Sequence, residues 1–175
     1  MARFHLSNSK QLRIKISPNM EPDIYKPKGF WYDIDLDWVR WVLGEGYEND
    51  SRWMRPYLYE VTVDEARLLR ISDISAFDKF CADYYAPAFP EIPAIRQAGI
   101  DWQKLKSRFS GLEIAPYLWE RRLSRYNGGP DCLWYYGWDC ASGVIWDPSA
   151  ICMAELIADT EGAILKFYGH LHPDE

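Results

Sequence analysis

The order of strand-like and helix-like segments constrains the fold of this chain more than any single motif. Alternating or aromatic segments typical of strands come first, at residues 3–7, 12–16, 30–32, 56–63 and 68–71. Segments with apolar residues at helical spacing fill the middle, and strand-like residues 111–115 and 143–146 come later. Because strand and helix do not alternate regularly, this order predicts an α+β fold with a mostly antiparallel sheet.

Residues that commonly begin or end helices mark where the helices should lie. The expected starts are Asp35 or Asp37 for a helix ending at Gly44 or Gly46, Ser75 for the next helix, Asp101 for a third, and Pro116 for a helix running to about Leu123. Residues 151–170 fit a strand and a helix equally well.

Composition predicts one globular domain with an unusual density of aromatic rings. The chain has 175 residues, of which 48% are hydrophobic, so one core is sufficient and disorder is excluded. Nine tryptophans and twelve tyrosines indicate thick core layers, a stacking surface, or both.

Charge and cysteine usage exclude several classes of protein. The net charge of −6 disfavours nonspecific binding to nucleic acid. The first residues lack the apolar run of a signal peptide, and no apolar segment is long enough for a membrane span, so we expect a cytoplasmic protein with no membrane partner. In that compartment the four cysteines, Cys81, Cys132, Cys140 and Cys152, should be reduced and buried. His170 and His172 could chelate a metal, but two histidines near a C-terminus are more often a polar tail, and we predict no metal site.

The stretch from Gly29 to Val42 joins an aromatic strand to an amphipathic helix. Phe30, Trp31 and Tyr32 follow the glycine, and Trp38 and Trp41 occupy one helical face. A strand–helix pair with this many rings can build a core or line a binding cleft.

Six short segments, taken in order, resemble the ADP-ribosyltransferase fold. This fold is shared by poly-ADP-ribose polymerases, DNA-modifying ADP-ribosyltransferase toxins and RNA 2′-phosphotransferases. The similar segments are the histidine-containing strand at 3–7, Gly-Phe-Trp-Tyr-Asp at 29–33, the strands at 57–64 and 68–71, Phe-Ser-Gly-Leu-Glu-Ile at 109–114, and Ser-Gly-Val-Ile-Trp-Asp-Pro-Ser-Ala-Ile at 142–151.

The resemblance implies that residues 1–175 form a single ADP-ribosyltransferase-like domain with a split, mostly antiparallel sheet. It implies NAD⁺ as the substrate, cleavage of the nicotinamide–ribose bond, and transfer of ADP-ribose to water or to a protein or nucleic-acid acceptor. The small size suits a toxin or a phage effector. The residues implied in cofactor binding are His5, Ser7, Gly29, Phe30, Trp31, and either Trp38 or Trp41 as the ring that stacks on nicotinamide, with Trp41 slightly preferred.

The expected catalytic carboxylate departs from the family pattern, because Ser142 stands where the family has glutamate. Glu113 is the first candidate to replace it, with Asp139 second, although Glu113 could equally be an outward-facing strand residue. Two alternatives remain open at this point. One is a binding or inhibitor module on a fold that has lost its chemistry, and the other is a structural aromatic-rich protein.

Overall fold

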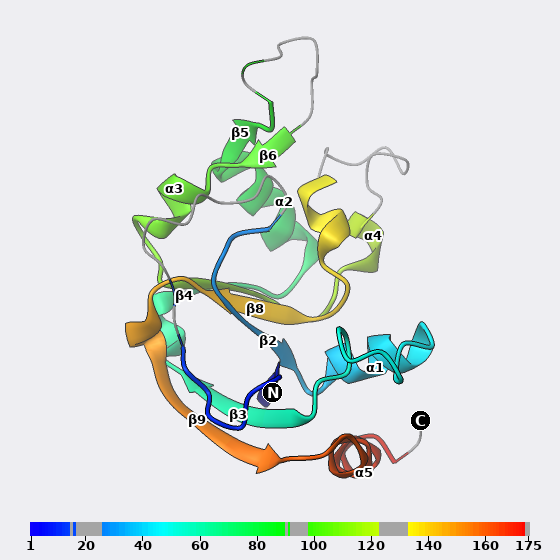
Figure 1. Cartoon of the computed structure of the whole chain (residues 1–175). Coiled ribbons are helices and arrows are strands. Elements are labelled where there is room, and N and C mark those ends of the chain that lie inside the picture. Colours follow the sequence, from blue (N-terminus) through cyan, green and yellow to red (C-terminus); the bar gives the residue numbers. More distant parts are fainter. Residues whose placement is uncertain (15, 17–25, 90, 92–97, 123–132, 174–175) are drawn as a thin grey trace.

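A seven-stranded sheet with the order β4-β7-β8-β2-β1-β3-β9 organises the protein, as seen in a computed structural model (Figure 1). The structure describes residues 1–14, 16, 26–89, 91, 98–122 and 133–173. The strands of the sheet are β1 (Arg3–Ser7), β2 (Phe30–Ile34), β3 (Tyr57–Val63), β4 (Leu68–Ile71), β7 (Gly111–Ile114), β8 (Ser142–Ile145) and β9 (Ile151–Ala158). The sheet is antiparallel except for the parallel pair β4–β7, so the predicted α+β class with a mostly antiparallel sheet is confirmed.

The helices lie in two groups around this sheet. They are α1 (Asp37–Gly44), α2 (Ile74–Asp83), α3 (Trp102–Lys106), α4 (Trp119–Arg122) and α5 (Glu161–Leu171), with short 3₁₀ turns η1 (Glu65–Arg67), η2 (Leu133–Gly137) and η3 (Pro148–Ala150). Figure 1 shows α2, α3 and α4 beside β4 and β8, together with the small pair β5 (Tyr85–Pro87) and β6 (Ala98–Ile100). On the other side α1 and α5 lie near one end of β3 and β9. None of the helices among the described residues is both long and apolar enough to cross a membrane.

Helix caps follow the predicted pattern only in part. Asp101 caps α3 as predicted, accepting a hydrogen bond from the Lys104 backbone N–H at 2.9 Å. The cap of α2 is Asp73 rather than Ser75. Neither Asp35 nor Asp37 is the N-cap of α1, because Leu36 occupies that position in a left-handed conformation with φ of 61° and makes no side-chain cap.

Strand predictions hold for the sheet and fail for the segment after β1. The strands expected at 3–7, 30–32, 56–63, 68–71, 111–115 and 143–146 are all present within a residue or two at their ends. Residues 12–14 and 16 form no strand, and Leu12, Ile14 and Ile16 pack against the core instead. The ambiguous C-terminal region contains both elements in turn, β9 followed by α5, so the chain closes on a helix. The helix expected from Pro116 is present but begins at Trp119.

Two hydrophobic clusters form the core. The larger one joins β2, β4, β7 and β8 to α2, α3 and η2, with a contribution from β3. The smaller one joins β1, one residue each of β3 and β9, α1 and α5. Both clusters are rich in rings, which accounts for part of the aromatic content.

No disulfide joins the three cysteines among the described residues, and they are not all buried. Cys140 is buried and Cys81 is half-buried, whereas Cys152 on β9 is exposed. The prediction of burial is therefore wrong for Cys152, since its side chain lies on the outer surface of an edge strand. Cys132 lies outside the described residues.

Candidate functional site

A cleft of about 890 Å³ opens where β1 and β2 stop pairing. Only two residue pairs join these strands, Arg3 with Ile34 and Phe4 with Asp33. Beyond them the cleft is lined by the rest of β1, by residues 29–33, and by the segment that leads into β8. A volume of this size is typical of sites for small ligands and cofactors.

The cleft gathers most of the site residues predicted from the sequence. It is lined by His5, Ser7, Gly29, Phe30, Trp31, Trp38, Asp139 and Ser142. Trp41 and Glu113 are not among its lining residues. Positions that are far apart in the chain therefore meet in one concave surface. Of the two candidates for the stacking ring, Trp38 lines this cleft and Trp41 does not.

Contacts with the backbone and with a neighbouring ring hold His5 in one orientation, and burial favours its neutral form. Its Nδ1 lies 2.7 Å from the backbone oxygen of Trp31, and its ring centroid lies 4.4 Å from that of Phe30. Burial lowers the pKa of His5, and the nearby Arg55 lowers it further, although the Trp31 carbonyl opposes this. A neutral imidazole that donates from Nδ1 to the carbonyl leaves Nε2 as a hydrogen-bond acceptor.

Tryptophans form much of the remaining wall. The rings of Trp31 and Trp138 meet edge to face with centroids 4.8 Å apart. Trp38 donates its indole N–H to the backbone oxygen of Trp53 at 3.1 Å, which fixes the ring at the cleft. Trp41 packs against both Trp38 and Trp53 and lines a separate hollow, so its contacts are those of a packing residue.

Gly29 lines the cleft, but its lack of a side chain serves the sheet. A Cβ at this position would lie 2.5 Å from the backbone oxygen of Ile145 and 2.7 Å from a methyl group of Val144. The glycine is therefore required for contact with β8, whereas the resemblance implied that it takes part in cofactor binding. Any larger residue here would displace β2 from its neighbour.

Two carboxylic acids, Asp33 and Asp139, and the hydroxyl of Ser142 are among the polar groups that line the cleft. Asp139 is 3.8 Å from the Lys26 ammonium and 3.5 Å from the Arg122 guanidinium, and burial raises its pKa. The Ser142 hydroxyl donates to the backbone oxygen of Cys140 at 3.0 Å. Asp33 is buried, with 5% of its surface exposed.

The cleft is positively charged although the chain is acidic. Four cationic side chains line it, Arg13, Lys26, Arg52 and Arg55, against the two acids Asp33 and Asp139. The whole chain carries a net charge of −6. Sequence reasoning missed these cations because they lie in three separate segments and no motif links them.

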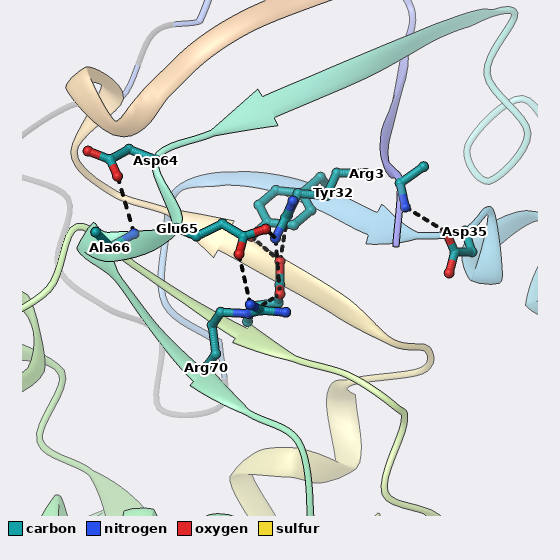
Figure 2. A network of polar contacts seen from close by, with 9 residues as sticks. Arg3, Tyr32, Asp35, Asp64, Glu65, Ala66 and Arg70 are labelled. Atoms are coloured by element: carbon teal, nitrogen blue, oxygen red, sulfur yellow. Dashed lines mark hydrogen bonds and ion pairs between the residues drawn. The ribbon is translucent and has the colours of Figure 1, made fainter.

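Glu113 lies instead in a buried ion-pair network that joins four strands of the sheet. Figure 2 shows Arg3, Tyr32 and Arg70 pointing toward one another. The Glu113 carboxylate accepts from Arg3 Nε at 2.7 Å, from Arg70 Nε at 2.9 Å and from the Tyr32 hydroxyl at 3.0 Å, and only 1% of the residue is exposed. Two guanidinium groups already neutralise this carboxylate, so its contacts favour a structural role over the catalytic one suggested by the sequence.

Within the part of the chain that the structure describes, no three His, Cys, Asp or Glu side chains are arranged to hold a metal ion. The C-terminal histidines have other contacts, His170 with the Lys166 backbone oxygen at 2.6 Å and His172 with that of Asp35 at 2.8 Å.

Comparison of the chain with models of known protein families, with curated proteins and with solved structures found no match.

Proposed function

We propose that this domain binds NAD⁺ in the cleft between β1 and β2, cleaves the nicotinamide–ribose bond, and transfers ADP-ribose to a macromolecular acceptor or to water. The observation that carries the proposal is the convergence of His5, Trp31, Trp38 and Ser142 in one cleft. His5, Trp31 and Ser142 come from three separate segments that resemble ADP-ribosyltransferases, and Trp38 comes from the helix after the second of them.

The charge distribution of the cleft supports a dinucleotide ligand. Arg13 is exposed and Arg55 is half-buried, so they can reach an anionic pyrophosphate. The exposed Arg52 guanidinium already donates to both oxygens of the Asp50 carboxylate. The Arg55 guanidinium also donates to the Leu6 backbone oxygen at 3.3 Å, which holds it beside β1. A ligand with a central negative charge and flat rings at both ends matches cations combined with aromatic walls.

The reaction requires little covalent chemistry from the protein. The bond between ribose C1′ and the nicotinamide nitrogen breaks, its electron pair leaves with neutral nicotinamide, and water or an acceptor nucleophile adds to the ribose carbon and loses a proton. The protein must hold the ribose and stabilise positive charge that develops on the sugar. The neutral His5, with Nε2 free to accept, suits a ribose hydroxyl.

Chromatographic detection of free nicotinamide after incubation with NAD⁺ tests the proposal. Active protein should release nicotinamide in proportion to its concentration, and His5→Ala should lower the rate at an unchanged circular-dichroism spectrum. Calorimetry with millimolar NAD⁺ gives the matching binding measurement. No heat and no release from folded protein would contradict the proposal.

Ser142 gives one specific reason to keep a second candidate, a binding module without catalysis. Its hydroxyl cannot provide the negative charge of a glutamate at the corresponding family position, and it already donates to Cys140. NAD⁺ binding without nicotinamide release would favour this second function.

A further inference from the structure

Asp33 is a buried acid with an unused oxygen in the wall of the cleft. It is the first residue of β2 that pairs with β1, opposite Phe4, and on its other side it pairs with Ser142 of β8. Directly opposed residues of neighbouring strands project on the same face, so Asp33 lies between these two side chains. The carboxyl accepts hydrogen bonds from the Leu36 and Trp38 backbone N–H groups, but Oδ1 has no partner among the described residues.

A buried oxygen without a partner is uncommon in a folded protein and needs an explanation. A structural cap would be complete with the two backbone donors, and an amide would serve equally well. A carboxylate can do one thing that an amide cannot, which is to balance a positive charge brought into a desolvated site.

Two tryptophans of the cleft wall flank this acid in the chain. Trp31 lies two residues away on the same face of β2, and Trp38 is fixed to Asp33 through its own backbone N–H. Both rings line the cleft. Flat walls beside a carboxylate favour a cation that is itself flat, because stacking and charge neutralisation act together.

We propose that the Asp33 end of the cleft binds a cationic aromatic ring, with the Asp33 carboxylate as its counter-ion and the neighbouring tryptophans as its stacking surface. The inference deepens the proposed function and rests on it for the natural ligand, because the pyridinium ring of NAD⁺ has this chemistry. It also predicts selectivity, since the reduced cofactor has a neutral ring and should bind less tightly.

The charge state of Asp33 links this binding to pH. Burial raises the pKa of Asp33 well above its ordinary value, and the nearby Asp37 and Asp35 raise it further. The buried thiol of Cys140, on the segment before β8, is the other titratable group that interacts with it. A raised pKa favours the protonated acid in the free protein, whereas a bound cation favours the carboxylate. Affinity for the cation should therefore increase with pH, while affinity for a neutral ring should not.

Calorimetric titration with two small probes tests the inference without the rest of the dinucleotide. The probes are nicotinamide methylated on its ring nitrogen, which is a cation, and nicotinamide itself, which is neutral. Wild-type protein should bind the cation at least about tenfold more tightly, and Asp33→Asn should remove most of this preference while leaving affinity for neutral nicotinamide within about twofold. Asp139→Asn, which alters the other acid of the cleft, is the matched control and should keep the preference.

Each outcome separates the inference from the proposed function. Equal affinity of the wild-type protein for the two probes, or equal losses for both in Asp33→Asn, would overturn the role of Asp33. Should Asp33→Asn fail to fold, the wild-type preference and its increase with pH still decide the matter. Binding of the cationic probe without binding of NAD⁺ would support the inference and remove the proposed function.

Discussion

Glu113→Gln tests whether the buried acid of β7 holds the sheet together. The substitution keeps the size of the side chain but removes the charge that Arg3 and Arg70 share, and it places an amide N–H₂ among three donor groups. Breaking a buried ion pair from one side typically costs about 3–5 kcal/mol in the free energy of unfolding. Arg3 keeps a second carboxylate, Glu65, at 2.6 Å, so we expect the lower end of that range.

The pKa values of the network agree with this expectation. Burial alone would lower the pKa of Arg3, but the hydrogen bonds to Glu113 and Glu65 raise it, so the native state holds the guanidinium charged. Burial, followed by the charge and the hydrogen bond of Glu113, raises the pKa of Tyr32 and keeps its hydroxyl a donor. The carboxylate is therefore the centre on which the other groups depend.

Thermal unfolding followed by circular dichroism provides the measurement. For a chain of this length, a loss of about 3 kcal/mol lowers the melting temperature by roughly 6–12 °C. Glu65→Gln is the control: Glu65 pairs with the same Arg3, but its side chain is 50% exposed, so the loss should be at most about 1 kcal/mol. An unchanged melting temperature in Glu113→Gln, combined with a large loss of nicotinamide release, would refute this reasoning and return Glu113 to a catalytic role.

Four further substitutions test the cleft and the sheet. Trp38→Ala should weaken NAD⁺ binding roughly tenfold, the cost of one lost stacking contact, whereas Trp41→Ala should instead lower stability by about 3 kcal/mol; calorimetry and thermal unfolding of both variants distinguish the two roles. Asp33→Asn should stabilise the folded protein more at pH 8 than at pH 5. Above the ordinary pKa of an aspartate, Asp33 ionises in the unfolded chain, whereas its raised pKa opposes ionisation in the folded protein, so the wild-type protein loses stability as the pH increases. Each unit by which the folded-state pKa is raised costs the wild-type protein up to about 1.4 kcal/mol in the free energy of unfolding, a cost that asparagine avoids. Melting curves of both proteins at the two pH values check the sign. Gly143→Ala should lower the free energy of unfolding by about 1–3 kcal/mol, measured by urea denaturation, because the new methyl group would lie 2.3 Å from the Tyr32 ring.

The fold class was predictable because its signals are local. Alternation in β3, the ring-bearing strand β2 and the helical spacing of Trp38 and Trp41 each depend on residues close in the chain. The exception was the segment at 12–16, where Leu12, Ile14 and Ile16 alternate like a strand but pack against the core without pairing. Alternation reports which side chains are buried, and it cannot show whether a neighbouring strand is present.

Long-range pairing limited prediction of the site. Asp33 lies just before the helix start expected at Asp35 or Asp37, and only the meeting of β2 with β1 and β8 shows that it is buried beside the cleft. Glu113 was weighed as either catalytic or outward-facing, and its two arginine partners, 110 and 43 residues away in sequence, make it neither solvent-exposed nor unpaired. One local signal for Asp33 did exist. It is an acid two residues after Trp31, within a strand whose other members are all apolar or aromatic.

The short junction between β1 and β2 has a consequence for how the protein opens. Two residue pairs connect strands that belong to different hydrophobic clusters, one built with α1 and α5 and the other with α2 and α3. Such an arrangement favours two cooperative unfolding units rather than one, and native-state hydrogen exchange should resolve them as two groups of amides with different opening free energies. The amides of residues 5–7 should exchange with the less stable group. A ligand seated in the cleft would then slow exchange in both groups at once, because it contacts the two units on either side of their boundary.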